Sequence, residues 1–120
     1  MKSVLYAALT TVTIACGFDF PPVNDLRIEG GIKQLDSRKY FVTVCNRSDK
    51  ESHNRPYEVI FRLDDEILNT RPRKDTADIG ACLDSEQVTV PEGRTGKLKA
   101  YADWHSIEDF PVDNYVERDI

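Results

Sequence analysis

Alternation of apolar and polar residues with a period of two runs through most of this chain and constrains its fold more than any other feature. It is clearest over residues 57–64 and 97–104, where every second residue is apolar. Successive side chains of a strand point to opposite faces, so the pattern predicts strands that bury one face. Further strands are expected over residues 25–29, 40–44, 87–90 and 115–120, the first of them closed by Gly30-Gly31.

Turn-forming residues separate these stretches. They include Pro72, Gly80, Pro111 and the run Pro91-Glu92-Gly93. Asp64-Asp65-Glu66 is expected to form a turn, and the basic run 71–74 a solvated loop. A chain of 120 residues accommodates one small domain. Six or seven short strands at this spacing predict an all-β fold, an antiparallel sandwich over residues 23–120.

The first fifteen residues differ from the rest. Lys2 supplies one positive charge, and residues 3–15 then carry none, which is the pattern of a secretory signal peptide and is too short to span a bilayer as a helix. The junction Ala15-Cys16 resembles the bacterial lipobox, whose cysteine is lipid-modified and becomes the new N-terminus. We therefore expect a signal peptide over 1–15, a lipidated Cys16 and a proline-stiffened tether over 16–22. An ordinary cleaved signal peptide and an N-terminal strand of a cytosolic protein are the alternatives.

The three cysteines are consistent with lipidation. If Cys16 carries lipid, Cys45 and Cys82 remain and can form a disulfide in an oxidising compartment. Two separate thiols are the alternative. The two histidines, His53 and His105, have no metal-binding spacing, so neither a metal site nor a cofactor is expected.

Several short motifs occur in an order that resembles the CARDB domain, the cell-adhesion-related domain of bacteria. They are Asp25-Leu26 and the runs at residues 42–46, 59–65, 86–90 and 100–103. The resemblance covers residues 24–120 and implies an immunoglobulin-like sandwich of about seven strands. Such domains are found in exported bacterial and archaeal proteins.

The last hairpin of that family carries acidic and amide residues, which Asp103, Glu108, Asp113 and Asn114 match here. Asp113 replaces the first asparagine of the family pattern, and Pro111 stands in the place of a second glutamate. We expect Asp103 and Asn114 to hydrogen-bond the hairpin backbone rather than to bind a cation, as short polar side chains commonly do.

The net charge of the chain and its sequence motifs disfavour some classes of function. A net charge of −5 disfavours binding to nucleic acid, and no nucleophile motif indicates an enzyme. We expect a monomeric, non-catalytic binding module that engages a protein or polysaccharide of the bacterial envelope. Membrane contact is expected through the lipid alone, and Gly17 after the cysteine favours the outer membrane, facing the periplasm. The alternative is a lipid-anchored regulator, host- or phage-encoded, that docks on an envelope protein.

Overall fold

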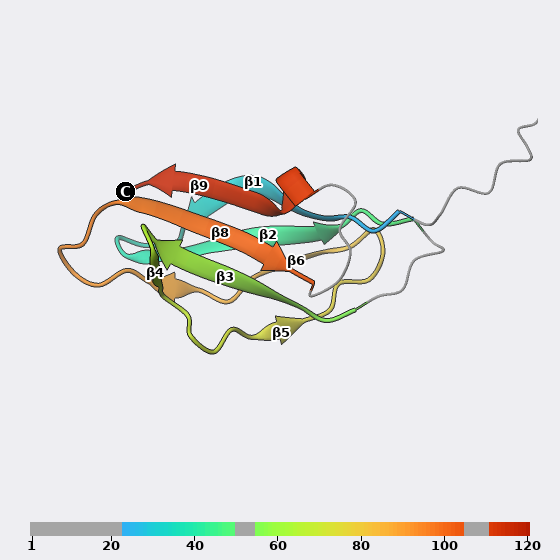
Figure 1. The fold of residues 1–120 in the computed structure, drawn as a ribbon, viewed down its shortest axis with the longest axis horizontal. Helices are drawn as coiled ribbons and strands as arrows, with labels where there is room; N and C mark the ends of the chain where they lie inside the picture. The colour runs from blue at the N-terminus through green and yellow to red at the C-terminus, as the bar shows by residue number, and fades with distance from the viewer. Residues whose placement is uncertain (1–22, 50–54, 105–110) are drawn as a thin grey trace, which may run out of the picture.

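A computed structural model describes residues 23–49, 55–104 and 111–120, and these residues form two antiparallel sheets packed face to face (Figure 1). The first sheet contains β1 (Leu26–Gln34), β2 (Lys39–Asn46), β6 (Cys82–Asp84) and β7 (Val88–Thr89). The second contains β3 (Tyr57–Leu63), β4 (Glu66–Ile67), β5 (Lys74–Asp75), β8 (Lys97–Asp103) and β9 (Tyr115–Asp119). A short 3-10 helix, η2 (Pro111–Asn114), precedes β9. The predicted all-β sandwich is confirmed.

The nine short strands occupy seven positions in the two sheets. In the first sheet β6 and β7 pair with different parts of β2, and in the second β4 and β5 pair with different parts of β3. The order is therefore β1, β2 and β6/β7 in one sheet, and β4/β5, β3, β8 and β9 in the other. The chain passes between the sheets after β2, after β5 and after β7, which gives an immunoglobulin-like arrangement of about seven strands.

The core lies between the sheets and is made by the inward residues of the alternating stretches. Phe61, Leu63, Val42 and Leu98 are fully buried. Removal of such apolar area from water is the main force that holds the sheets together. Trp104 closes one end of the core, and its indole N–H donates to the backbone oxygen of Arg55 at 3.0 Å.

The first strand is longer than the sequence indicated. β1 does not end at Gly30-Gly31 but continues to Gln34 through an irregularity in its pairing with β2. Both glycines have positive φ, 82° and 68°, so they bend the strand within the sheet. The five residues of β1 from Glu29 to Lys33 oppose the three of β2 from Thr43 to Phe41, and the even number of extra residues keeps Ile32 on the core side.

Other turns agree with the sequence. Asp64-Asp65 connects β3 to β4, and Asp64 has a positive φ of 52°.

Within the described ranges, no helix has the length and apolar character needed to cross a bilayer.

Candidate binding face

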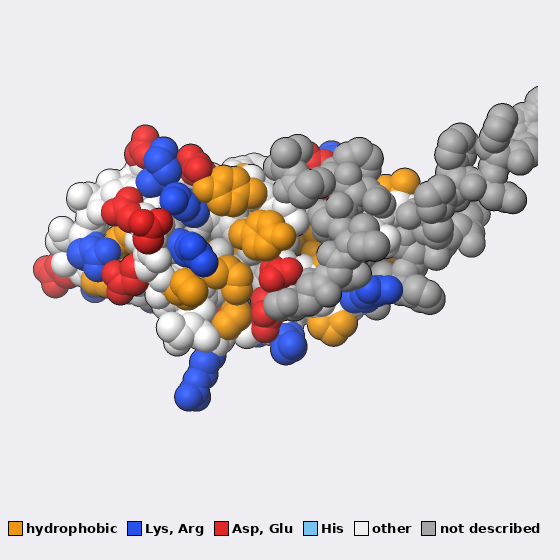
Figure 2. All heavy atoms as spheres, in the orientation of Figure 1, with side chains coloured by type: hydrophobic (Ala, Val, Ile, Leu, Met, Phe, Trp, Pro, Cys, Tyr) orange, Lys and Arg blue, Asp and Glu red, His pale blue; other side chains and the backbone are white. Residues whose placement is uncertain are grey.

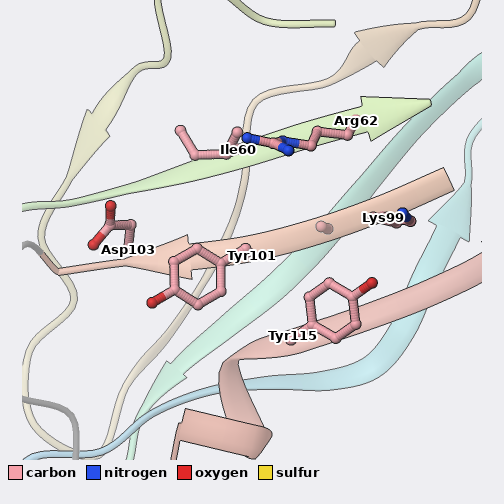
Figure 3. A pocket seen from close by; sticks show the side chains of 7 residues that line it. Ile60, Arg62, Lys99, Tyr101, Asp103 and Tyr115 are labelled. Atoms are coloured by element: carbon pink, nitrogen blue, oxygen red, sulfur yellow. The ribbon is translucent and has the colours of Figure 1, made fainter. Parts of the chain in front are cut away.

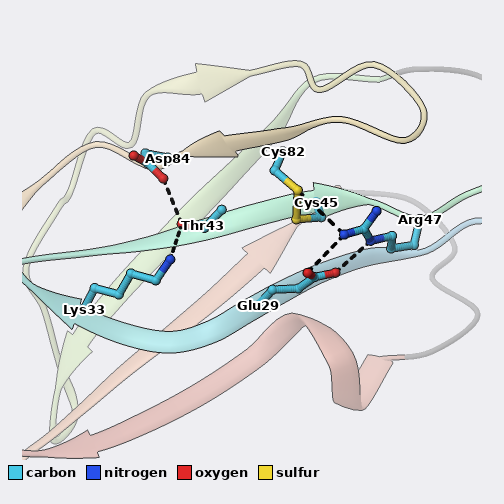
Figure 4. The surroundings of a disulfide bond; sticks show 7 residues. All are labelled: Glu29, Lys33, Thr43, Cys45, Arg47, Cys82 and Asp84. Carbon is cyan, nitrogen blue, oxygen red and sulfur yellow. Dashed lines mark hydrogen bonds and ion pairs between the residues drawn. A yellow bond between two sulfur atoms is a disulfide. The ribbon is translucent and has the colours of Figure 1, made fainter.

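Cys45 and Cys82 are joined by a disulfide, as predicted (Figure 4). They lie directly opposite each other on β2 and β6, with their Cα atoms 4.0 Å apart. The bond therefore connects neighbouring strands of one sheet, unlike the disulfide of antibody domains, which joins the two sheets. Cys45 is buried and Cys82 is exposed.

Two charged side chains, Arg47 and Glu29, lie next to the exposed sulfur of Cys82. Arg47 donates to both carboxylate oxygens of Glu29, at 2.7 and 3.0 Å, and its guanidinium also lies 3.8 Å from the Cys82 sulfur. The hydrogen bond from Arg47 lowers the pKa of Glu29. Glu29, Cys45 and Cys82 are the one group of potential metal ligands that lies together among the described residues. With both sulfurs in a disulfide and Arg47 on the carboxylate, this group is organised as a structural cross-link.

The residues of the predicted acidic hairpin differ in their contacts and positions. Asn114 is buried and donates from its amide to the backbone oxygen of Ala102 at 3.0 Å, in the hydrogen-bonding role expected of it. Asp113 lies 3.6 Å from the Arg27 guanidinium. Asp103 lies on the outer face of β8, where it lines a shallow hollow. Glu108, like the lipidation candidate Cys16, lies outside the described residues.

The other sequence candidates give no site. His53 and His105 fall outside the described residues. In the basic run, Arg73 pairs with Asp75 at 2.9 Å, and Lys74 lies 3.7 Å from Glu58.

The strongest candidate site is the outer face of β3, β8 and β9. There a hollow of about 510 Å³ is open to solvent, a volume within the range of ligand-binding sites. We name this surface the tyrosine face and define it by six lining residues, Ile60, Arg62, Lys99, Tyr101, Asp103 and Tyr115. Figure 3 shows the two tyrosine rings side by side, with Arg62 and Lys99 toward one end and Asp103 at the other.

Strand register explains why these residues meet. Tyr101 on β8 lies opposite Ile60 on β3 and opposite Tyr115 on β9, so three apolar or aromatic side chains form a row across the sheet. Each tyrosine keeps 39% of its surface exposed. In Figure 2 hydrophobic side chains occupy the middle of this face between charged ones.

A second row, one step along the strands, is charged. Arg62 lies directly opposite Lys99, which in turn lies opposite Glu117. Among the described residues neither Arg62 nor Lys99 makes an ion pair. Like charges directly opposite each other destabilise a sheet, and Glu117, whose pKa Lys99 helps to lower, offsets this only on the side of β9.

Glu117 is already engaged by other groups. It accepts a hydrogen bond from the Tyr115 hydroxyl and forms an ion pair with Lys97 at 3.3 Å. The hydrogen bond raises the pKa of Tyr115 and lowers that of Glu117. Lys97 also pairs with Asp119 at 3.4 Å. The direct hydrogen bond to Glu117 holds the Tyr115 ring in place, while the positive charges of Arg62 and Lys99 face solvent.

Sequence reasoning did not identify the tyrosine face. Tyr101 was visible as an outward residue in an otherwise regular strand, and an outward aromatic residue is a usable signal. Its position opposite Tyr115 depends on the register between β8 and β9, which follows from the connection between them and could not be read from alternation.

Comparison of the chain with protein-family models, curated proteins and solved structures gave no significant match.

Proposed function

We propose that this chain is a non-catalytic binding module of the bacterial envelope and that it binds its partner through the tyrosine face. The observation that carries the proposal is the exposed row formed by Ile60, Tyr101 and Tyr115, beside two cations that make no ion pair with any described residue. Exposed aromatic side chains grouped on one face, with an arginine beside them, have the composition of interaction surfaces.

The proposed location rests on the leader and on the disulfide. A lipid on Cys16 would hold the domain at a membrane, and the tether over 16–22 would leave the sandwich free to reach a partner. The Cys45–Cys82 disulfide supports export, because disulfides persist in oxidising compartments and are rare in the cytosol. The resemblance to the CARDB domain points in the same direction.

The test is photo-crosslinking in cells that produce the full chain. A photoreactive phenylalanine analogue, which keeps an aromatic ring at the position, replaces Tyr101 in one variant and Leu83 in the other. Leu83 is the matched control, because it lies on the opposite sheet and is exposed to nearly the same degree, 38% against 39%. The proposal expects adducts from position 101 and few from position 83.

The nature of the adduct separates the two forms of the proposal. An adduct that resists protease and is shortened by glycan-degrading enzymes supports an adhesion-type module. A single protein adduct of fixed mass supports the lipid-anchored regulator. Equal crosslinking from positions 101 and 83, or none from 101, contradicts the role of the tyrosine face.

A further inference from the structure

The charges of the tyrosine face restrict the ligands that it can bind. Arg62 and Lys99 lie at one end of the hollow and Asp103 at the other. A ligand that fits must place an anionic group near the two cations. A uniformly neutral ligand leaves the repulsion between Arg62 and Lys99 in place, whereas an anionic group offsets it.

The side chains in the middle of the tyrosine face restrict the shape of the ligand. Tyr101 and Tyr115 offer two adjacent rings, and Ile60 extends the apolar surface on β3. Flat aromatic rings suit a ligand with an apolar face and a polar rim. Saccharide rings have this form, since axial C–H groups cover one face and hydroxyls surround the edge.

A carboxylate on a saccharide ring satisfies both restrictions. We infer that the tyrosine face binds a uronic acid residue of an acidic polysaccharide, with its carboxylate between Arg62 and Lys99 and its ring on Tyr101 and Tyr115. Charge-assisted hydrogen bonds to a carboxylate are the strong ones, and arginine presents a fork that matches its two oxygens. The anion would also offset the repulsion between the two cations. This inference rests on the proposed function and names its ligand.

Two other classes of polymer fit less well. Single-stranded nucleic acid also combines stacking with cations, but its binding needs a groove of basic residues that follows the backbone, whereas this face offers two cations and the chain has a net charge of −5. An acidic peptide would supply carboxylates but would leave the paired rings without a flat partner. Both become outcomes of the test.

The experiment measures binding of the full-length chain, extracted in detergent, to oligogalacturonate. The expected result is binding that weakens as salt is raised and falls at least about tenfold when the oligomer is methyl-esterified, since the ester keeps the ring and removes the charge. Tyr101→Ala should weaken binding by about tenfold or more, as loss of a stacking ring does elsewhere. Polyglutamate and oligothymidylate of matched charge should bind at least about tenfold more weakly.

The matched control is a pair of lysine variants on the same strand and face. Lys99→Gln removes a cation that has no ion pair within the described part of the chain, whereas Lys97→Gln removes one that Glu117 and Asp119 already neutralise. Lys99→Gln should weaken binding several-fold, and Lys97→Gln should leave it nearly unchanged. Both positions lie on the outer face, so near-ultraviolet circular dichroism should show the same fold in each variant.

Three results would overturn the inference. They are equal binding of the esterified oligomer, equal losses from the two lysine variants, and preference for polyglutamate or oligothymidylate. If crosslinking from position 101 persists while oligogalacturonate does not bind, the ligand class is wrong and the binding face stands. If crosslinking from that position is also absent, both proposals fail.

Discussion

Tyr57 belongs to the core and is 1% exposed, and its hydroxyl has no hydrogen-bond partner among the residues that the structure describes. A buried polar group without a partner costs about 1–3 kcal/mol. Tyr57→Phe keeps the ring and removes that group. We expect the variant to unfold at higher denaturant concentration, with a gain of about 1 kcal/mol in the free energy of unfolding.

The same hydroxyl makes the free energy of unfolding depend on pH in the alkaline range. Burial raises the pKa of Tyr57 from 10.0 to about 12. Below pH 10 the phenol is protonated in both states and has no pH-dependent effect. Between pH 10 and 12 the unfolded chain releases the proton first, so the free energy of unfolding falls by up to about 3 kcal/mol. Denaturant titrations of the native chain and of Tyr57→Phe check this prediction. If the difference between their free energies of unfolding does not widen above pH 10, the prediction is wrong.

Gly96 shows how a turn depends on the absence of a side chain. Its φ is +145°, and a Cβ at this position would lie 2.6 Å from a carboxylate oxygen of Asp64. That carboxylate accepts the backbone N–H of Lys97 at 3.0 Å, so it cannot move away without loss of a hydrogen bond. We expect Gly96→Ala to lower the free energy of unfolding by about 2–4 kcal/mol.

Gly93→Ala is the control for backbone strain alone. Gly93 also has a positive φ, 79°, but nothing lies within 4 Å of a Cβ placed there. Its substitution should cost only about 1–2 kcal/mol. Equal losses from the two alanine variants in thermal unfolding would show that contact with Asp64 has no effect.

At the scale of the strands, Arg118 connects the two sheets along one side of the sandwich. From β9 it donates to the backbone oxygen of Ile32 and to the side-chain oxygen of Gln34, both at 3.0 Å, and both acceptors lie on β1. Its guanidinium also lies 5.5 Å from the centre of the Tyr40 ring on β2. The contacts of one side chain thus reach two strands of the facing sheet.

Arg118→Lys should therefore be costly although it keeps the charge. A single ammonium cannot reproduce the fork that reaches two acceptors, and the ring contact weakens. We expect a loss of about 2 kcal/mol in chemical unfolding. Arg94→Lys is the control, since Arg94 makes an exposed ion pair with Glu66 and should tolerate the change. A loss of similar size at both positions would contradict the proposed role of Arg118.

Strand alternation predicted the core well and the pairing poorly. The inward positions of residues 57–63 and 98–104 are buried as expected, because a period of two assigns faces without knowledge of neighbours. The same rule missed β4, β5 and β6, which are only two or three residues long. Pairing with β2 or β3 defines these strands, and no local pattern marks them. The tyrosine face was missed for the same reason, since Tyr101 and Tyr115 meet only through register.

For the whole molecule, the disulfide joins positions 37 residues apart within one sheet. In the chain-entropy account, closure of such a loop stabilises the folded state by about 4 kcal/mol. The crossing from β2 to β3, the β4 and β5 strands and the return to β6 all lie inside the loop. The Cys45→Ala, Cys82→Ala double variant should lose about 3–4 kcal/mol in chemical unfolding. Reduction of the native chain should cost a similar amount, and an unchanged midpoint would contradict the stabilising role.

The disulfide and the leader together make a prediction about where the chain resides. If residues 1–15 direct export and Cys16 receives lipid, the mature chain has one modified cysteine and two oxidised ones. Intact mass after detergent extraction should show loss of the leader, addition of a diacylglyceryl group and the absence of two hydrogens. Cys16→Ser should prevent the lipid addition, because a hydroxyl does not replace the thiol that carries it. Cys82→Ser is the control, since it should remove the disulfide and leave the lipid in place. A full-length, unmodified and fully reduced product would contradict export and anchoring together.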